Sequence, residues 1–311
     1  MKLVFLDAGT LFGVSNLDIL SQFGECQFHH HSQPSEIVDR LSNAAIAITN
    51  KVVIGRNEMK ALPDLRLICV AATGMNNIDL EAARELNIAV KNVSGYSTHS
   101  VAQITWGMIF HLLNHTTYYD QYVKSGEYVK NEFFTHVAKP FWQVAGKRIG
   151  IVGMGNIGKR VAEIATAFGM EVVYSSLSGK NSAQPYKLLS FDELLKTSDI
   201  VSIHSPLNDY TKGLFTYEKL SLMKSNAILI NVGRGGIVDE YALAKALDEN
   251  KIAAAGIDVF EKEPMIASNP LLKISNPEKL VLLPHIAWAS VEARERLVEL
   301  IKSNIEEFLA K

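Results

Sequence analysis

The stretch that decides the fold is residues 148–169, RIGIVGMGNIGKRVAEIATAFG, where an apolar run leads into a glycine-rich turn and then a helix-like pattern. The turn itself reads Gly153-Met154-Gly155-Asn156-Ile157-Gly158. In such a turn the first glycine permits a tight bend, the second lets backbone approach a pyrophosphate, and the third allows close helix-to-strand contact. The N-terminus of the following helix offers free N–H groups to an anion. A plain strand-to-helix turn is the alternative, but the context on both sides favours dinucleotide binding.

Apolar runs alternate with helix-like segments on both sides of this turn. From Lys147 onward, six runs are strand-like, namely KRIGIVG, EVVYS, DIVSIH, AILINVG, IAAAGIDV and LVLLPH. This alternation predicts an α/β Rossmann domain, with a doubly wound parallel sheet. The first 95 residues contain four further runs, KLVFLDA, AAIAIT, LRLICVAA and IAVKNV, which predict a second parallel sheet covered by helices. Asp79 is expected to cap the helix that follows it.

The composition excludes several classes of protein. The 311 residues include 31 Lys+Arg and 33 Asp+Glu, so a formal charge of −2 argues against a broad nucleic-acid surface. With 48% apolar and 21% charged residues, the chain is typical of a folded protein. Asp7 interrupts the first apolar run, and no run approaches the ~18 to 20 residues of a membrane span, so we expect neither export nor a membrane anchor. Two cysteines fit a reducing cytoplasm, and no metal site is expected.

The second strand of the Rossmann pattern ends without the expected acid. A carboxylate about 20 residues after the glycine-rich turn usually accepts hydrogen bonds from the adenosine ribose. Here GMEVVY runs into Ser175-Ser176-Leu177-Ser178-Gly179-Lys180. A 2′-phosphate could be bound here by the hydroxyls of Ser175 and Ser176 and by the Lys180 ammonium. A carboxylate at the same place would repel it. We therefore predict a nicotinamide cofactor, NAD(P)H, with a slight preference for NADPH over NADH.

Three later strands are each followed by a polar residue at the edge where an open α/β sheet places its ligand. Arg234 lies in NVGRGG, Glu263 in DVFEKEP and His285 in LLPHIAW. Singly, each has a structural explanation as a loop stabiliser, a solvated turn residue or a packed strand end. Together, and downstream of GMGNIG, their order resembles the D-isomer-specific 2-hydroxyacid dehydrogenases. The resemblance covers essentially the whole chain, including ATGMNNIDL and GYSTHSVAQ near the N-terminus.

The resemblance implies a discontinuous architecture. The Rossmann cofactor domain, residues 98–286, is inserted into a smaller flavodoxin-like substrate domain formed by residues 1–97 and 287–311. A long helix from about Thr98 to Leu113 is expected to leave the first domain, and the last helix to return to it. The resemblance also implies an active-site cleft that closes about a hinge near Thr98 and Ile286, which would exclude water from hydride transfer.

The resemblance also assigns roles to the three polar residues. His285 acts as the acid–base group, because its unperturbed pKa of about 6.5 lies near operating pH. Glu263 orients the imidazole and favours its protonated form. Arg234 binds the substrate carboxylate through its planar fork and helps to polarise the ketone.

Weaker assignments follow from matching loops. Backbone N–H groups of Ala72, Thr73, Gly74 and Met75 are expected to bind the substrate carboxylate, and Trp288 to form an apolar wall or else a core tryptophan. Thr211 is either a cofactor-loop residue or a helix cap. The remaining expected cofactor contacts, besides the glycine-rich turn and the two serines, are His204, Pro206, Val232, Gly233, Arg234, Asp258 and His285.

The substrate branch is indicated by two segments. The segment His285-Ile286-Ala287-Trp288-Ala289-Ser290 and the segment Gly95-Tyr96-Ser97-Thr98 are similar to the glycerate dehydrogenase and hydroxypyruvate or glyoxylate reductase branch. This similarity implies reduction of hydroxypyruvate and glyoxylate to D-glycerate and glycolate, with pyruvate poorer. Glu263 stands where related formate dehydrogenases carry Gln, which favours ketone chemistry and leaves phosphite oxidation as a remote alternative.

A second class of function stays open. The C-terminal binding protein corepressors resemble the same family, keep the Arg, Glu and His, and act mainly through partners. They carry long tails, whereas this sequence ends 26 residues after His285, so an interaction role is the weaker hypothesis. The family usually forms homodimers through the cofactor domain. The helix SVAQITWGMIFHLL is either the contact element or an intramolecular core helix.

Overall fold

The computed structural model describes residues 1–179 and 181–310. The chain forms two compact units, one of residues 1–97 with 288–311 and the other of residues 98–287. The chain therefore returns to the first unit after residue 287, one residue later than the expected boundary after residue 286. Ala287 belongs with the second unit because its N–H donates to Asp258 and its carbonyl accepts from the Ser100 hydroxyl.

Unit 1 is built on a five-stranded parallel sheet in the order β2-β1-β3-β4-β5, which is the flavodoxin-like order 2-1-3-4-5. The strands are β1 (Lys2–Phe5), β2 (Glu25–Phe28), β3 (Ile46–Thr49), β4 (Leu67–Val70) and β5 (Ala89–Asn92). The helices are η1 (Ala8–Leu11), η2 (Leu17–Phe23), η3 (Pro34–Glu36), α1 (Ile37–Arg40), α2 (Arg56–Lys60), α3 (Leu80–Glu85) and α10 (Val291–Leu309).

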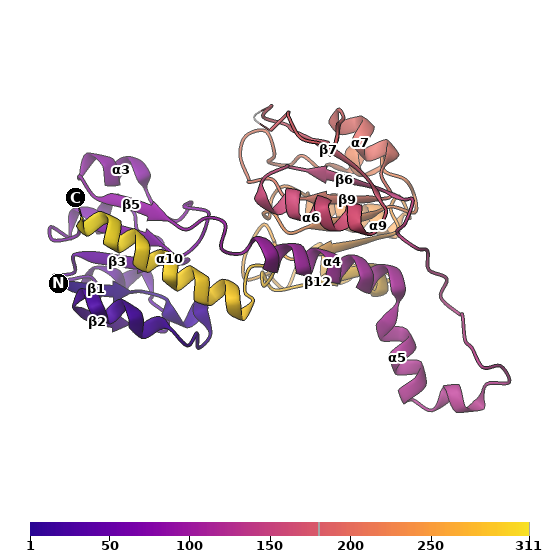
Figure 1. Ribbon diagram of the computed structural model, residues 1–311, viewed down its shortest axis with the longest axis horizontal. Helices are drawn as coiled ribbons and strands as arrows, with labels where there is room; N and C mark the ends of the chain where they lie inside the picture. The colour runs from indigo at the N-terminus through magenta and orange to yellow at the C-terminus, as the bar shows by residue number, and fades with distance from the viewer. Residues whose placement is uncertain (180, 311) are drawn as a thin grey trace. The chain divides into compact units, whose positions relative to one another are not determined.

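Both faces of this sheet are covered, as parallel pairing requires. On one face the core includes Val4, Ala47 and Ile68, and on the other Leu3, Ile46 and Leu67. The second face is completed by α10, whose Leu297, Val298, Ile301 and Ile305 are fully buried. Figure 1 shows α10 lying along the strands of this unit. The C-terminal helix therefore completes a core that the first 97 residues begin.

Two details of unit 1 bear on the sequence predictions. The expected cap at Asp79 is confirmed, because its carboxylate accepts from the Ala82 N–H at 2.9 Å at the start of α3. Strand β2 was not predicted. Its sequence, ECQF, lacks an apolar run because it lies at the sheet edge, paired only with β1, and its side chains are partly or fully exposed.

Unit 2 contains a seven-stranded parallel sheet in the order β12-β11-β10-β9-β6-β7-β8. Around β6 this order matches the Rossmann arrangement 3-2-1-4-5-6, so the predicted fold class is confirmed. The strands are β6 (Arg148–Val152), β7 (Glu171–Ser175), β8 (Lys187–Leu188), β9 (Ile200–Ile203), β10 (Ile228–Asn231), β11 (Ala254–Ile257) and β12 (Leu280–Leu282). Strand β8 was not predicted, because it is a two-residue exposed edge strand.

The helices of unit 2 are α4 (Thr98–Asn114), α5 (Thr116–Lys124), η4 (Glu127–Lys130), α6 (Asn156–Ala167), α7 (Phe191–Thr197), α8 (Tyr217–Leu220), α9 (Glu240–Asp248), η5 (Pro270–Lys273) and η6 (Pro277–Lys279). Helix α4 packs on α6 and on strands β10, β11 and β12, and buries Val101, Trp106, Ile109 and Leu113. Much of this helix is therefore core, which favours the intramolecular interpretation of SVAQITWGMIFHLL.

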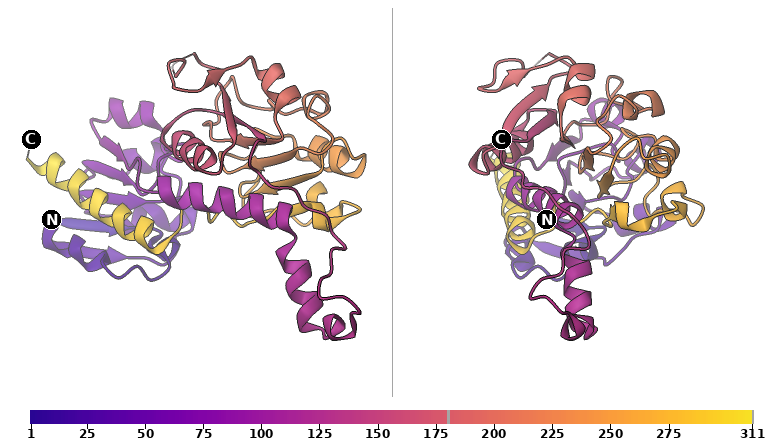
Figure 2. Two further views of the ribbon diagram at one scale, coloured as in Figure 1. Left: turned by 45° about the vertical axis from the view of Figure 1, so that its right-hand side comes forward. Right: turned by 90° about the vertical axis from the view of Figure 1, so that its right-hand side faces the viewer.

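Residues 116–143 form an arm that extends away from the rest of unit 2 (Figures 1 and 2). Its interior is a polar aromatic cluster in which the rings of Tyr122 and His136 stack at 3.8 Å and the Tyr118 hydroxyl lies 3.0 Å from His136 Nε2. Its apolar side chains point outward, with Val129 87% and Phe134 91% exposed. The arm therefore presents apolar surface to its surroundings.

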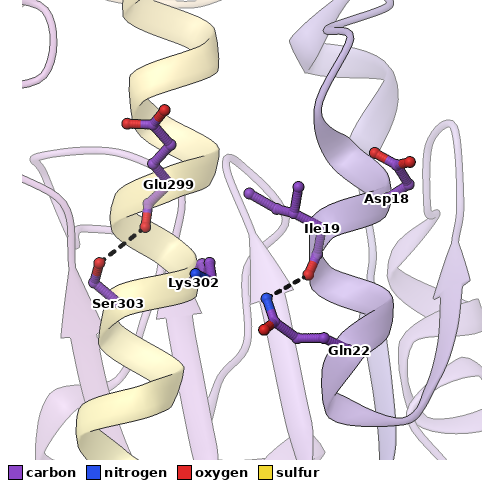
Figure 3. A pocket seen from close by; sticks show the side chains of 6 residues that line it. All are labelled: Asp18, Ile19, Gln22, Glu299, Lys302 and Ser303. Atoms are coloured by element: carbon purple, nitrogen blue, oxygen red, sulfur yellow. Dashed lines mark hydrogen bonds between the residues drawn. The ribbon is translucent and has the colours of Figure 1, made fainter.

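Unit 1 has a polar groove between η2 and α10 (Figure 3). Its charged and polar side chains do not bridge the two helices. The Ser303 hydroxyl donates to the Glu299 carbonyl, and the Gln22 amide donates to the Ile19 carbonyl. The groove is thus a solvent-exposed gap between the polar faces of two helices. In neither described stretch is a helix both long enough and apolar enough to cross a membrane.

Candidate active site

The carboxyl ends of the parallel strands of unit 2 meet at one edge of the sheet. The glycine-rich turn follows β6, Ser175 ends β7, His204 follows β9, Arg234 lies just beyond β10, Asp258 follows β11 and His285 lies just beyond β12. Open α/β sheets bind ligands at this edge, where the strand order reverses. The reversal here lies between β6 and β9. The sequence-predicted residues of unit 2 therefore share the edge at which a dinucleotide binds.

The glycine-rich turn has the backbone that its sequence predicts. Gly153 has a left-handed φ of 98°, and its N–H donates to the Ser175 carbonyl at 3.2 Å. A Cβ on Gly158 would lie 2.2 Å from the Gly153 carbonyl oxygen, so only glycine permits this close approach of helix and strand. A Cβ on Gly155 would meet no atom within 4 Å, which leaves open space above the backbone. Because α6 begins at Asn156 directly behind it, the turn fits a bound pyrophosphate.

The end of β7 is where the ribose of a dinucleotide is expected. The Ser175 side chain is buried, whereas Ser176 is partly exposed and its hydroxyl accepts from the Asn181 N–H at 3.4 Å. Lys180, the third residue predicted here, lies outside the described residues. Residues 176–186 contain no Asp or Glu. A 2′-phosphate at this place would meet no carboxylate from this segment.

The loop after β9 contains a buried histidine. The ring of His204 shares a hydrogen bond with the Ser202 hydroxyl at 2.8 Å through Nε2, while Nδ1 is buried without a protein partner in the part of the chain that the structure describes. Burial lowers the pKa of His204 to about 3, so the ring is neutral at physiological pH. An unpartnered buried nitrogen at the ligand edge of the sheet fits a polar cofactor contact.

Pro206 and Thr211 close the same loop. The Thr211 hydroxyl is buried, donates to the Pro206 carbonyl at 2.7 Å and accepts from the Asn208 N–H at 2.8 Å. These bonds hold the loop together, and no helix begins at residue 211. The alternative of a helix cap at Thr211 is therefore wrong. Its hydroxyl instead fixes the turn on which the predicted cofactor contact depends.

The turn after β10 carries Val232, Gly233 and Arg234. Asn231 organises it, because its side chain accepts from the Gly233 N–H at 3.0 Å and donates to the Arg234 carbonyl at 3.1 Å. A Cβ on Gly233 would lie 2.8 Å from the Ser205 carbonyl oxygen, so this turn packs directly on the loop after β9. The Arg234 guanidinium donates one N–H to the Gly233 carbonyl at 2.8 Å. Its other donors remain for a carboxylate ligand.

Glu263 and His285 form a direct pair. His285 Nδ1 lies 2.7 Å from Glu263 Oε2, with the side chains 21% and 33% exposed respectively. The other carboxylate oxygen of Glu263 accepts from the Phe260 N–H at 3.0 Å. Because Nδ1 faces a carboxylate, it carries the ring proton, and Nε2 on the opposite side of the ring can exchange a proton with a substrate.

Asp258 holds the backbone next to His285. Its carboxylate accepts from the N–H groups of Ile286 and Ala287 at 2.8 and 3.0 Å. His285 itself has a left-handed φ of 55°, a conformation that costs energy in a residue with a Cβ and that its surroundings must maintain. Burial raises the pKa of the Asp258 carboxyl to about 6, although the two N–H groups and the charge of His285 oppose that rise. Asp258 therefore fixes the chain that presents the imidazole, in addition to its predicted place near the cofactor.

The predicted substrate residues of unit 1 lie in two places. The loop of Ala72, Thr73, Gly74 and Met75 follows β4 and is tied to the end of β5, because the Thr73 hydroxyl donates to the Val93 carbonyl and the Asn92 amide donates to the Thr73 carbonyl. Trp288 is partly buried on the core beside α10 and meets the Tyr96 ring edge-on at 6.3 Å. Both structural features are compatible with the predicted roles, which stay predictions.

The sequence did not indicate two polar residues that bond to the segments carrying the predicted site residues. Asn231 organises the Arg234 turn, and Glu240 at the start of α9 bonds to the loop that carries Glu263. An Asn at a strand end directly before a glycine-rich turn is a signal that could have indicated the first. For Glu240 the sequence shows only an acidic residue in the first turn of a helix, which does not indicate a contact with a distant loop. No cluster of three or more metal-ligating side chains occurs within residues 1–179 and 181–310.

Fold and site together define a class, a nicotinamide-dependent oxidoreductase. The sequence profile described as D-isomer specific 2-hydroxyacid dehydrogenase, NAD binding domain, matches residues 106–287. The chain belongs to the D-isomer-specific 2-hydroxyacid dehydrogenase family. This finding does not favour the alternative of a corepressor-like interaction protein.

Known relatives span nearly the same length. The chain is 37% identical to a glycerate dehydrogenase from Methylorubrum extorquens, with 99% of this chain and 96% of the relative covered. It is 35% identical to a hydroxypyruvate reductase from Blautia hydrogenotrophica (99% and 97% covered) and 38% identical to a glyoxylate reductase from Aeropyrum pernix (94% and 89% covered). Among solved structures, an acyclic imino acid reductase in complex with NADPH and D-Arg has a TM-score of 0.88 at 31% identity, with 100% and 97% covered.

Proposed function

We propose that the protein reduces hydroxypyruvate and glyoxylate to D-glycerate and glycolate. The observation that carries the proposal is the contact between His285 Nδ1 and Glu263 Oε2, which leaves Nε2 to donate a proton. A carboxylate at 263 supports ketone and alcohol chemistry, which moves a proton, over formate oxidation, which does not. The names of the similar glycerate dehydrogenase, hydroxypyruvate reductase and glyoxylate reductase support the choice of substrate.

In this proposal the nicotinamide cofactor supplies the hydride that reaches the ketone carbon. Arg234 binds the 2-oxo acid's carboxylate and draws electron density from the ketone. His285 gives its Nε2 proton to the ketone oxygen as the hydride arrives, so the product alcohol gains one hydride and one proton. The imidazole then regains a proton from solvent. The Glu263 carboxylate stabilises the imidazolium before transfer and keeps the ring oriented throughout.

The roles proposed for unit 1 rest on the resemblance. Backbone N–H groups of residues 72–75 bind the substrate carboxylate, and Trp288 offers a flat apolar surface with an N–H donor. The fixed loop geometry at Thr73 supports the first role, since a preorganised loop loses little entropy on binding. In this proposal residues 1–97 with 288–311 act as the substrate domain, and residues 98–287 as the cofactor domain.

A substrate panel tests the proposed function. Oxidation of NADPH and of NADH is followed at 340 nm with hydroxypyruvate, glyoxylate and pyruvate in turn. We expect kcat/KM to be higher for hydroxypyruvate and glyoxylate than for pyruvate. Pyruvate turned over tenfold better than both would overturn the substrate ranking. The absence of activity with every 2-oxo acid, alongside a co-purifying partner protein, would instead favour an interaction role.

For the cofactor we propose NADPH as the slightly preferred reductant. The support is the segment after β7, where residues 176–186 contain no Asp or Glu, so a 2′-phosphate would meet no carboxylate from this segment. Steady-state kinetics with saturating hydroxypyruvate and varied NADPH or NADH measure the preference. A hundredfold preference for NADH in kcat/KM would contradict this assignment.

We also propose a homodimer in the cytoplasm. The apolar side chains of the arm formed by residues 116–143 support an interface between two copies, because an exposed surface of this kind is typical of a protein contact. The two cysteines are both unpaired, which supports a reducing compartment. Size-exclusion chromatography with light scattering should give twice the chain mass of 34.3 kDa. A strict monomer would refute the dimer.

A further inference from the structure

Glu240, the first residue of α9, uses its carboxylate on another segment of the chain. The helix is capped by the preceding residue, Asp239, whose side chain accepts from the Ala242 N–H. Both oxygens of Glu240 instead contact the loop after β11. Oε1 accepts from the Glu261 N–H at 2.8 Å, and Oε2 accepts from the Asn269 side-chain amide at 2.6 Å. Glu240 is therefore not needed as a helix cap.

The two partners of Glu240 stand on either side of Glu263. Glu261 precedes it by two residues and Asn269 follows it by six. Asn269 is only 4% exposed, and its side-chain Oδ1 accepts from the Leu271 N–H at 2.9 Å at the start of η5. One carboxylate thus ties both ends of an otherwise largely exposed loop to the start of α9.

This attachment lies one peptide away from the contacts of Glu263. The Phe260 N–H, which donates to Glu263 Oε1, immediately precedes the Glu261 peptide that Glu240 holds. The same place touches the Arg234 turn, because a Cβ on Gly235 would lie only 1.8 Å from the Phe260 carbonyl oxygen. A shift of the backbone at residues 260–261 would therefore move the Glu263 carboxylate and press on the turn that carries Arg234.

We propose that Glu240, bonded to the Glu261 N–H and to Asn269, is a positioning residue that places the Glu263 carboxylate against His285 for proton transfer. The proposal rests on the proposed function for its role in turnover, and on the geometry of unit 2 for its effect on the imidazole. Glu240 touches no reacting atom in this account. It acts through the backbone at residue 261 and the side chain at residue 269, and it deepens the assignment of the Glu263–His285 pair.

The test variant is Glu240→Gln. A glutamine has one acceptor oxygen, whereas both partners of Glu240 are donors, so one of the two bonds must be lost. We expect kcat for hydroxypyruvate reduction to fall about tenfold, since small misplacements around a reacting pair are costly in rate. The KM for NADPH should stay within about twofold, because the variant leaves the glycine-rich turn untouched. The alkaline limb of the pH profile for reduction should move toward lower pH, since a displaced carboxylate stabilises the imidazolium less.

A double variant, Glu240→Gln with Asn269→Asp, supplies the rescue. The side chain at 240 can then accept from the Glu261 N–H and donate its amide to residue 269. The side chain at 269 can accept that bond with one oxygen and the Leu271 N–H with the other. We expect kcat and the pH profile to return to within about threefold of the wild type. Glu218→Gln, in the first turn of α8, is the matched control, because Glu218 is exposed and bonds locally to Thr216.

The imidazole titration of His285 supplies a readout that does not need turnover. Followed by NMR and assigned with His285→Ala, its midpoint should move to lower pH in Glu240→Gln and return in the double variant. The carboxylates of Glu263 and Asp258 face this ring within unit 2, and neither is altered in these variants. A wild type without 2-oxo acid reduction would sink the proposed function while leaving this titration to decide the role of Glu240.

Two results would overturn the positioning role. One is a Glu240→Gln protein that melts at lower temperature but keeps the wild-type kcat, pH profile and His285 titration, which would make Glu240 merely a structural tie. The other is a folded double variant whose profile stays that of the single variant, which would show that the bonds to residues 261 and 269 do not matter.

Discussion

The Glu263–His285 pair allows the effect of Glu263→Gln to be worked from the structure. Two unit charges about 4 Å apart near a protein surface interact by about 4 kcal/mol at an effective dielectric constant of about 20. The two side chains are 33% and 21% exposed, so solvent screening reduces this to about 1 to 2 kcal/mol. Glutamine keeps the shape and one acceptor but removes the charge. We therefore expect Glu263→Gln to lower kcat/KM about tenfold at high pH and to move the alkaline limb of the reduction profile toward lower pH.

The assay is kcat/KM for hydroxypyruvate reduction measured from pH 5 to pH 9 in wild type and Glu263→Gln. The sign follows from the chemistry, because reduction needs the imidazolium and the carboxylate stabilises that cation. At high pH the kcat/KM of the variant should be about tenfold lower than that of the wild type, and at pH 5 the difference between the two should be smaller. An equal loss at every pH, with the limb unmoved, would refute the electrostatic reasoning and leave Glu263 as an orienting residue alone.

Three further predictions rest on single contacts. His204 stays neutral to about pH 3, whereas an unfolded His gains a proton below about pH 6.5, so stability falls as pH falls. From pH 7 to pH 5 the wild type should lose about 2 kcal/mol more unfolding free energy than His204→Asn in urea titrations, and equal losses would contradict this. Gly158→Ala places a Cβ 2.2 Å from the Gly153 carbonyl oxygen, so it should lower the free energy of unfolding by about 1 to 3 kcal/mol and weaken NADPH binding. The control is Gly107→Ala in α4, whose Cβ meets no atom within 4 Å and which should change neither stability nor NADPH binding. Arg234→Lys removes the bidentate hydrogen bonding to a carboxylate and should raise the KM for hydroxypyruvate roughly 10- to 100-fold. An unchanged KM would show that Arg234 does not bind the substrate.

Much of the fold could be predicted because buried parallel strands are apolar runs. Strands such as β6 and β9 are covered on both faces, so every residue of β9 is apolar or small and all are buried. Strands β2 and β8 escaped prediction because an edge strand needs no such run. The arm was missed for a related reason. Its interior is made of tyrosine and histidine rings, and the apolar side chains face outward, so no apolar periodicity marks it.

The candidate site was predictable where a residue's chemistry is tied to a local motif. The backbone needs glycine at Gly153 and Gly158, Gly155 leaves open space above the backbone, and the spacing of these glycines in the sequence indicates both features. The bonds made by Glu240 could not be read in the same way, because they join residues 21 and 29 positions apart. Only the packing of α9 beside the loop after β11 brings those groups together. The roles in turnover proposed for the predicted site residues remain predictions for experiment.

We propose that His285 donates the proton in the reduction of a 2-oxo acid. The most direct measurement is kcat for hydroxypyruvate reduction by His285→Ala, with NADPH binding measured separately to show that the cofactor site is intact. A positioned acid–base group contributes on the order of 10² to 10⁴ in rate, and the account predicts a loss of that size with cofactor affinity retained. A loss of less than fivefold would contradict it.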